Sequence, residues 1–158
     1  MRLKSALRRG VAAAVIAGIV VSSGIPAYAE RWNIAKGDIT VEAGGAGGTN
    51  KVTQGETTKE DTDTVITGES DKNTVTIDTS ESNVDVTFDD LKIDVSGKGE
   101  AAVTVKGGHD ATIELDGKNE LKSGSYNAGL EKNKQESKGT LTIKDDKGKD
   151  GSLTAEGG

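Results

Sequence analysis

Short stretches in which apolar and polar residues alternate recur along most of this chain, and they constrain its fold more than any other feature. Apolar residues take every second position, and Thr, Lys, Asp and Glu fill the positions between them. Such stretches are typical of strands with one buried face. After residue 30 no segment shows a capped helical period, so the sequence predicts an all-β fold. The clearest stretches are 39–43, 75–77, 84–88, 93–95, 103–105, 113–115 and 141–143.

The predicted strands also recur as groups of three. Equivalent apolar positions follow one another at offsets of 27 or 28 residues, and we align Val75–Val103–Leu130, Val86–Ile113–Leu141 and Phe88–Leu115–Ile143. A fixed period of this length indicates a solenoid. We therefore predict a parallel β-helix with three strands per coil, in preference to an ordinary β-sandwich.

The dipeptide Asp116-Gly117 lies between two alternating stretches, which is a strong signal for a hairpin. A hairpin turn needs a fixed spacing, but the spacing across equivalent places grows from three to six to ten residues, in the pairs Phe88–Leu91, Leu115–Leu121 and Ile143–Leu153. We therefore expect Asp116-Gly117 to be a corner between two faces of a β-helix.

Residues 1–29 have the order of a secretory signal peptide: a basic start, an apolar run of 11 residues and the triplet Ala27-Tyr28-Ala29. An apolar helix of this length is too short to span a bilayer, so we expect no transmembrane anchor here. We predict a signal-peptide helix, cleavage after Ala29, and a secreted or cell-surface protein. The absence of cysteine excludes a lipid-modified N-terminus and disulfides.

The remaining domain, residues 30–158, has 16 basic and 26 acidic residues, a net charge of −10. This balance argues against nucleic acid as a partner, because phosphates require Lys and Arg. It is compatible with divalent cations and sugars. The sequence stops at Leu153–Gly158, where a further strand of the repeat is expected. We therefore predict that the β-helix is truncated here and continues beyond Gly158.

Acidic residues gather at the predicted corners. Stacked coils would bring equivalent corners together, and Ca²⁺ accepts six to eight oxygen ligands in irregular cages. The candidate metal ligands are Asp89, Asp90, Asp116, Asp145, Asp146 and Asp150. The alternative is a solvated corner whose charge is offset by Lys118, Lys144, Lys147 and Lys149.

Catalysis has little support in the sequence. His109 is the only histidine and cysteine is absent, so neither a nucleophilic triad nor a zinc site is indicated. Arg31 is the only arginine after residue 29, which also argues against a polysaccharide lyase. We predict that the protein is not an enzyme.

Several segments resemble a family of bacterial secreted proteins called carbohydrate-binding domain-containing proteins. They are WNIAKGDITVEA, VDVTFDDLKIDVSG, AAVTVKGGHDATIELDGKNELKSG, NAGLEKN and GTLTIKDDKGKDGSLTAEGG, which together extend over most of residues 32–158. The resemblance implies a right-handed parallel β-helix related in shape to polysaccharide lyases but without their activity. It also implies binding to plant-type or acidic polysaccharides, with Ca²⁺ in some members, and occurrence within large surface adhesins.

We therefore expect an exported, non-catalytic polysaccharide-binding module, with Ca²⁺ as a candidate cofactor. The candidate carbohydrate-binding residues are Trp32, Thr104, Thr112, Asn119 and Tyr126. For Trp32, a place in the cap or core of the fold is the alternative. Two other functions stay open: a structural spacer in a larger adhesin, without a ligand of its own, and a polysaccharide lyase.

Overall fold

The computed structural model describes residues 30–132 and 138–158, and the signal peptide predicted for residues 1–29 lies outside them. The described residues form thirteen strands and one short 3₁₀ helix, which confirms the all-β prediction. In chain order they are β1 (Arg31–Asn33), η1 (Ile34–Lys36), β2 (Ile39–Ala43), β3 (Asn50–Gln54), β4 (Thr57–Asp61), β5 (Val65–Ser70), β6 (Val75–Asp78), β7 (Val84–Asp94), β8 (Val103–Lys106), β9 (Ala111–Asp116), β10 (Lys118–Lys122), β11 (Leu130–Lys132), β12 (Leu141–Lys144) and β13 (Ser152–Glu156).

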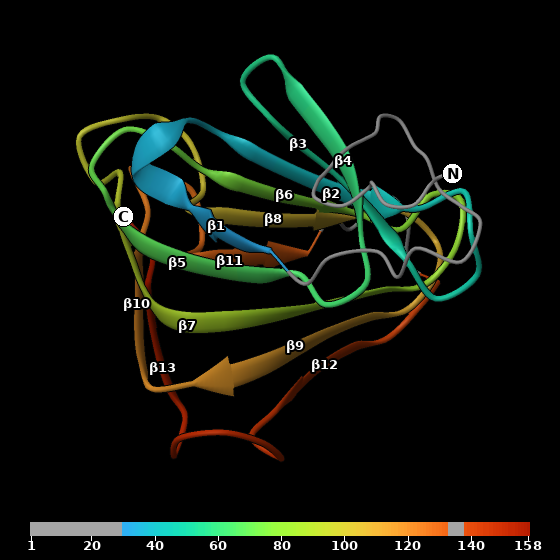
Figure 1. The fold of residues 1–158 in the computed structure, drawn as a ribbon. Coiled ribbons are helices and arrows are strands. Elements are labelled where there is room, and N and C mark those ends of the chain that lie inside the picture. The colour runs from blue at the N-terminus through green and yellow to red at the C-terminus, as the bar shows by residue number, and fades with distance from the viewer. Residues whose placement is uncertain (1–29, 133–137) are drawn as a thin grey trace.

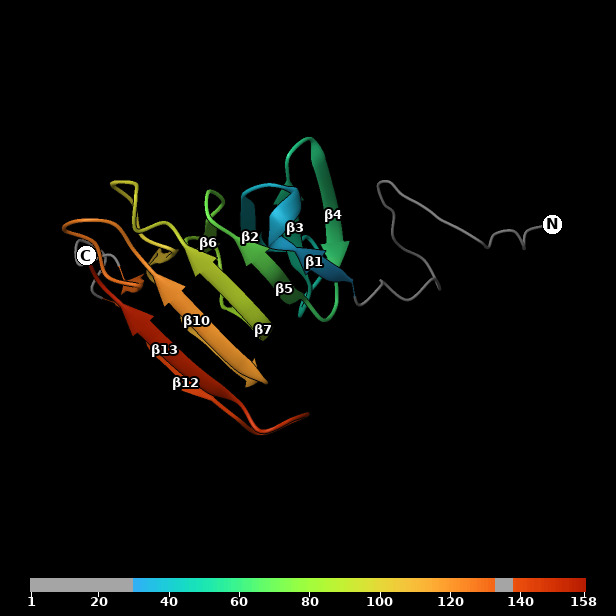
Figure 2. The same ribbon diagram turned by 90° about the vertical axis from the view of Figure 1, so that its left-hand side faces the viewer.

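The strands make two sheets (Figure 1). In the first sheet β1, β5, β7, β10 and β13 lie side by side in that order (Figure 2), and β9 pairs with β7 and with β12. The second sheet has the order β11-β8-β6-β2-β3-β4. The pairings are parallel except β2–β3 and β3–β4, which are antiparallel.

Four of the six residue pairs in the predicted repeat alignments are actual strand registers. Val75 lies opposite Val103 and Val103 opposite Leu130, at the predicted offsets of 28 and 27. On the first sheet, Val86 lies opposite Ile113 and Phe88 opposite Leu115, both at the predicted offset of 27. Alternation places these side chains on the inner faces of their sheets, where they are buried or half-buried.

Strand β12 is shifted from its predicted register. Leu141 lies opposite Ala111 and Ile143 opposite Ile113, an offset of 30 instead of 28. A shift of two residues keeps every side chain on the same face of the sheet, so alternation does not distinguish the two registers. The sequence therefore identified the strand and its inner face correctly, but its partner residues wrongly.

The sequence argued correctly against a hairpin at Asp116-Gly117, but the bend lies within the first sheet and not between two sheets. β9 and β10 pair with neighbouring strands and not with each other, and both lie alongside the single long strand β7. The equivalent backbone positions Asp90 and Gly117 both have positive φ, 51° and 71°. The chain turns here at a residue with a left-handed backbone conformation, which glycine adopts without strain.

The hydrophobic core lies between the inner faces of the two sheets and is formed mainly by Val, Ile, Leu and Phe88. It is complete at the central strands, where Ile77, Phe88 and Ile113 are 0% exposed. It thins toward β12 and β13, where Leu141 and Leu153 are only partly buried and Ile143 is 42% exposed.

Candidate ligand-binding groove

A polar groove of about 330 Å³ lies on the outer face of the first sheet, over β7, β9 and β12. The glycine-rich loop 44–49 and the segments 62–63 and 82–83 form its other walls. A second cavity of about 150 Å³ adjoins it and shares part of the lining. The shared residues are Asp63, Thr87, Glu114 and Lys147.

Strand alternation explains why polar side chains line this groove. In β9 the inner positions are taken by Ala111, Ile113 and Leu115, so Thr112 and Glu114 face outward. The parallel registers then align outward residues across three strands. The resulting rows are Asp85–Thr112–Thr142 and Thr87–Glu114–Lys144.

Glu114 is only 5% exposed although it belongs to the outer face. Its Oε2 accepts hydrogen bonds from the backbone N–H groups of Asp146 (2.5 Å) and Lys147 (3.0 Å). The Nζ of Lys144 lies 3.9 Å from its Oε1. Glu114 therefore holds the segment after β12 against the groove, which places Lys147 in the lining of both cavities.

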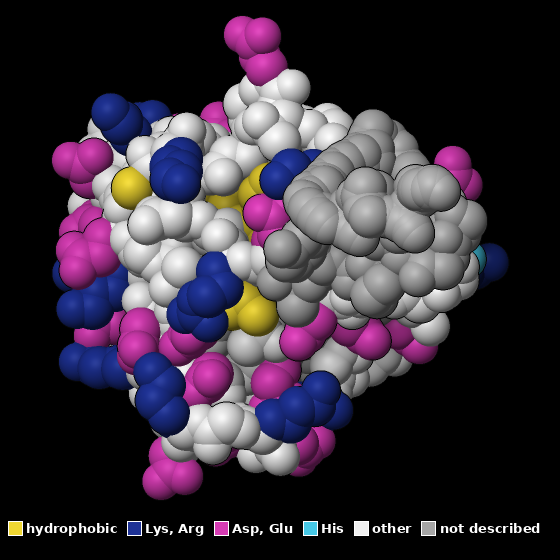
Figure 3. Space-filling view, in the orientation of Figure 1, with side chains coloured by type: hydrophobic (Ala, Val, Ile, Leu, Met, Phe, Trp, Pro, Cys, Tyr) yellow, Lys and Arg dark blue, Asp and Glu magenta, His cyan; other side chains and the backbone are white. Residues whose placement is uncertain are grey.

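The groove carries charges of both signs. The acidic lining residues are Asp63, Asp85 and Glu114, and the basic ones are Lys144 and Lys147. No aromatic side chain is among the lining residues. Acidic and basic side chains are also interspersed over the face of the molecule in Figure 3. Such a lining offers hydrogen bonds and local charges to a ligand, but no stacking surface.

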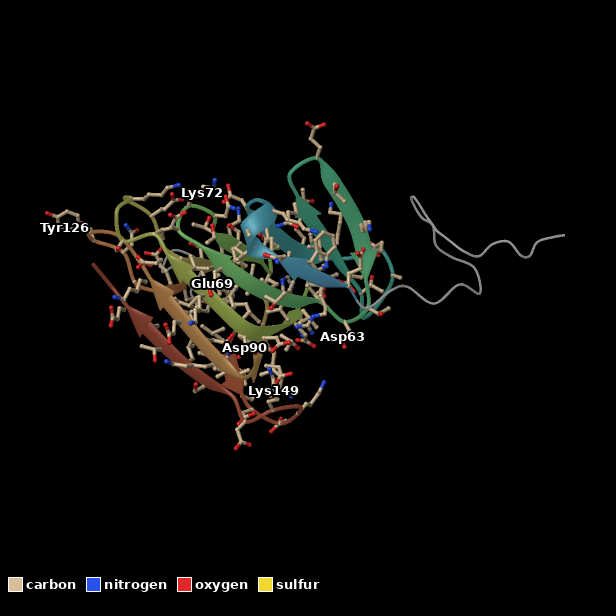
Figure 4. The ribbon with its side chains drawn as sticks, turned by 60° about the vertical axis from the view of Figure 1, so that its left-hand side comes forward. Asp63, Glu69, Lys72, Asp90, Tyr126 and Lys149 are labelled. Carbon is tan, nitrogen blue, oxygen red and sulfur yellow. The ribbon has the colours of Figure 1, made fainter. Side chains whose placement is uncertain are left out.

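A separate ion-pair cluster lies at the corner formed by β7. The carboxylate of Asp89 is buried, pairs with Arg31, and lies 3.2 Å from the Nζ of Lys149. The same Nζ lies 2.7 Å from Asp90, and Figure 4 shows Asp90 and Lys149 beside each other. Burial raises the pKa of Asp89, but hydrogen bonds and charge from Arg31 and Lys149 outweigh it and hold that pKa below its ordinary value. The pKa of Asp90 is also lowered, mainly by its hydrogen bond with Lys149.

Three of the six acidic corner residues form ion pairs with lysines, namely Asp89, Asp90 and Asp146. The Oδ1 of Asp116 accepts from the backbone N–H of Lys149 (2.8 Å), and Asp146 lies 3.1 Å from the Nζ of Lys144. Asp145 and Asp150 are exposed. The ranges 30–132 and 138–158 contain no group of three acidic or histidine side chains placed to hold one cation. Asp89 and Asp90 face cationic side chains, and the Ca²⁺ site at the six aspartates stays a prediction from the sequence.

The structure distributes the predicted carbohydrate-binding residues over different places. Thr112 lines the groove. Thr104 lies on β8, on the outer face of the other sheet. Tyr126 is 100% exposed, and in Figure 4 it lies at the opposite end of the molecule from Asp63.

The other two predicted residues are buried. Trp32 is 6% exposed and its Nε1 donates to Asp61, so it takes the core position that was the alternative for it. Asn119 is 0% exposed: its Oδ1 accepts from the N–H of Leu91, and its Nδ2 donates to the carbonyls of Gly117 and Ser152. Neither side chain presents a surface to a ligand.

Sequence reasoning did not propose Thr87 or Asp63 as binding residues. Thr87 was detectable, because it takes the outward position between Val86 and Phe88 in an alternating strand. Asp63 comes from the segment before β5, and no pattern in the sequence indicates that this segment reaches the groove.

No protein-family model, curated protein or solved structure matches this chain. The family resemblance therefore stays a prediction from the sequence. Within the part of the chain that the structure describes, no helix has the length and hydrophobicity needed to cross a bilayer.

Proposed function

We propose that this chain is an exported, non-catalytic module that binds polysaccharide along the groove over β7, β9 and β12. The observation that carries the proposal is the pair of outward polar rows across three parallel strands, whose members all line the groove except Thr142. Adjacent strands in a sheet are spaced by about 4.8 Å, so each row repeats hydroxyl, carboxylate or ammonium groups at that interval. An extended polymer is a suitable ligand for such a surface.

We further propose that the two sheets are faces of a right-handed parallel β-helix. Parallel pairing at offsets of 27 and 28 residues supports this assignment, because each strand then lies beside its equivalent in the next repeat. The antiparallel strands β3 and β4 are an insertion before the regular repeats begin.

The chemistry of the groove suits a hydroxyl-rich, plant-type glycan, and Lys144 and Lys147 add positive charges for the carboxylates of an acidic one. Without aromatic stacking, affinity would depend on hydrogen bonds to Thr87, Thr112 and the acids. The proposal does not require Ca²⁺.

The test is binding of residues 30–158 to a panel of insoluble and acidic plant polysaccharides, in Ca²⁺ and again in EDTA. We expect saturable binding to at least one polysaccharide, with the same dissociation constant in both buffers. Binding lost in EDTA would return the site to the aspartate corners. A folded sample that binds nothing would refute the proposed function.

A charge substitution tests whether the groove is the site. For an acidic glycan, Lys147→Ala is expected to raise Kd about fivefold, since one ion pair or charged hydrogen bond is lost. Lys106→Ala is the matched control, because Lys106 is an exposed residue at the end of β8 on the other sheet. Equal effects of the two substitutions would place the ligand elsewhere.

A second candidate function is a structural segment of a larger cell-surface protein. The partly exposed inner residues Leu141, Ile143 and Leu153 favour it, because another layer of strands stacked on β12 and β13 would bury them. Failure of a folded sample to bind any glycan in the panel would favour this alternative.

A further inference from the structure

Asp61, the last residue of β4, is a buried carboxylate outside the groove. It is 1% exposed and lies opposite Asn50 in the antiparallel pairing of β3 and β4. Its Oδ2 accepts a 2.7 Å hydrogen bond from the Nε1 of Trp32. Its Oδ1 accepts from the backbone nitrogens of Glu30 (3.2 Å) and Asp63 (3.1 Å).

These hydrogen-bond donors to Asp61 are uncharged as long as residue 29 is joined to Glu30. No ion pair among the described residues includes Asp61. The nearby Lys59 pairs with the side chain of Glu30 at 2.7 Å, and the exposed Asp63 adds a second negative charge. Burial raises the pKa of Asp61, and the hydrogen bonds from Trp32, from the two backbone groups and with the Thr64 side chain only partly offset it. A buried carboxylate without a counter-ion is costly.

We propose that cleavage between Ala29 and Glu30 supplies this counter-ion, and that Asp61 is the receiving site for the new α-ammonium group. Hydrolysis of this peptide bond by a signal peptidase consumes one water and leaves a carboxylate on Ala29 and an ammonium on Glu30. The nitrogen is the atom that already donates to Asp61. Its new positive charge turns a neutral hydrogen bond into a charge-assisted one, which is roughly twice as strong.

The consequence is that removal of the signal peptide completes the ion pair at Asp61. The Lys59–Glu30 ion pair holds Glu30 beside the end of β4, and Trp32 covers the other oxygen of Asp61. The site connects β1 to the β3–β4 hairpin. The processed protein is therefore more stable than the same chain with its leader attached.

The ion pair has a defined pH dependence. The carboxylate of Asp61 raises the pKa of the α-ammonium above its unfolded value of about 7.7–8.0. The extra stability is fully present below that value and is lost as the pH rises through the raised value in the folded protein. Glu30, Lys59 and Asp63 are the other charged groups at this site.

The test compares three forms of the chain: residues 30–158 with a free amino group, the same chain acetylated at its N-terminus, and residues 27–158, which retain Ala27-Tyr28-Ala29. Both sheets and the core lie within residues 30–158. At pH 6.5 we expect the free amine to have a melting temperature roughly 5 °C above the other two. Above about pH 10 the difference should disappear.

Two variants locate the effect. In Asp61→Asn the gap between free and acetylated chains should vanish, whereas in Lys59→Ala it should remain. Equal melting of the free and acetylated chains at pH 6.5, or a gap that persists in Asp61→Asn, would overturn the proposal. If Asp61→Asn does not fold, NMR titration of the Asp61 carboxyl decides: its pKa should be lower in the free amine, and equal values would refute the ion pair.

Discussion

At the scale of single residues, buried or half-buried polar side chains fix how the chain turns its corners. The carboxylate of Asp89 connects residues far apart in the sequence, Arg31 at the start and Lys149 near the end. The amide of Asn119 replaces a backbone partner for Leu91 at a corner where strand pairing is interrupted. Each of these contacts satisfies a group that the fold removes from water.

The lowered pKa of Asp89 predicts that the protein loses stability in acid. Because its pKa in the folded state lies below the ordinary value of 3.8, its contribution is present above about pH 4 and is lost as the pH falls through the folded value. We expect Asp89→Asn to lower the free energy of unfolding by about 2 kcal/mol at pH 7, because Arg31 and Lys149 lose their charged partner.

Denaturant unfolding of both proteins between pH 2 and pH 7 measures this effect, and the gap between them should close toward pH 2. Asp71→Asn is the matched control at an exposed site, with an expected change within about 0.5 kcal/mol. A gap that stays constant with pH would show that the charge of Asp89 is not what stabilises the corner.

The buried side chain of Asn119 also explains one error made from the sequence. The apolar pattern paired Leu121 with Leu91 and Leu153, but Leu121 lies opposite Ile93, and Asn119 is the residue opposite Leu153. A polar residue in an inward position is not recognised by a hydrophobic pattern. Its hydrogen bonds to backbone groups make that position favourable for it.

At the scale of strands and corners, the same contact recurs from one repeat to the next. The Oδ1 of Asp90 accepts from the N–H of Lys118 at 2.9 Å, and the Oδ1 of Asp116 accepts from the N–H of Lys149 at 2.8 Å. In both cases a glycine with positive φ precedes the lysine, and the carboxylate lies over that glycine. An Asp–Gly-Lys contact therefore links the corners of neighbouring repeats.

Gly117→Ala tests this corner. The backbone has φ of +71°, and an added Cβ would overlap Oδ1 of Asp90. We expect a loss of about 2 kcal/mol in the free energy of unfolding, from backbone strain and from displacement of the Asp90 carboxylate. Gly97→Ala is the control, because a Cβ there would meet nothing within 4 Å and its φ lies outside the left-handed region. A loss no larger than that of Gly97→Ala would contradict this account of the corner.

The alternating pattern predicted strand positions and inner faces well because burial depends directly on it. It also argued correctly against a hairpin at Asp116-Gly117, although the spacing argument used the wrong partner residues for Leu121. It failed for the register of β12, where a two-residue shift leaves alternation unchanged. The groove was only partly predictable, because Thr112 follows from alternation, whereas the approach of Asp63 and of loop 44–49 is tertiary.

At the scale of the whole molecule, the core is uneven from one end to the other. Ile113 is fully buried, with strands on both sides, whereas Leu141 on β12 is only partly covered. Stability should therefore be concentrated in the central strands and weaker at β12 and β13.

Two truncations measure this difference. We expect Ile113→Ala to lower the free energy of unfolding by about 3–4 kcal/mol, and Leu141→Ala by about 1 kcal/mol. Denaturant unfolding gives both values, and slower amide exchange in β7 and β9 than in β12 should accompany them. Equal losses from the two substitutions would mean that β12 is as well packed as the centre.

The central claim is that the polysaccharide binds on the outer face of the first sheet and not on the second. The most direct measurement is the affinity of Thr112→Val and of Thr104→Val for the polysaccharide that the unmodified chain binds best. Each change removes one hydroxyl at similar volume, Thr112 from the groove and Thr104 from the outer face of β8. We predict that Thr112→Val raises Kd about fivefold and that Thr104→Val leaves it unchanged. An increase for Thr104→Val alone, or for neither variant, would contradict the proposed site.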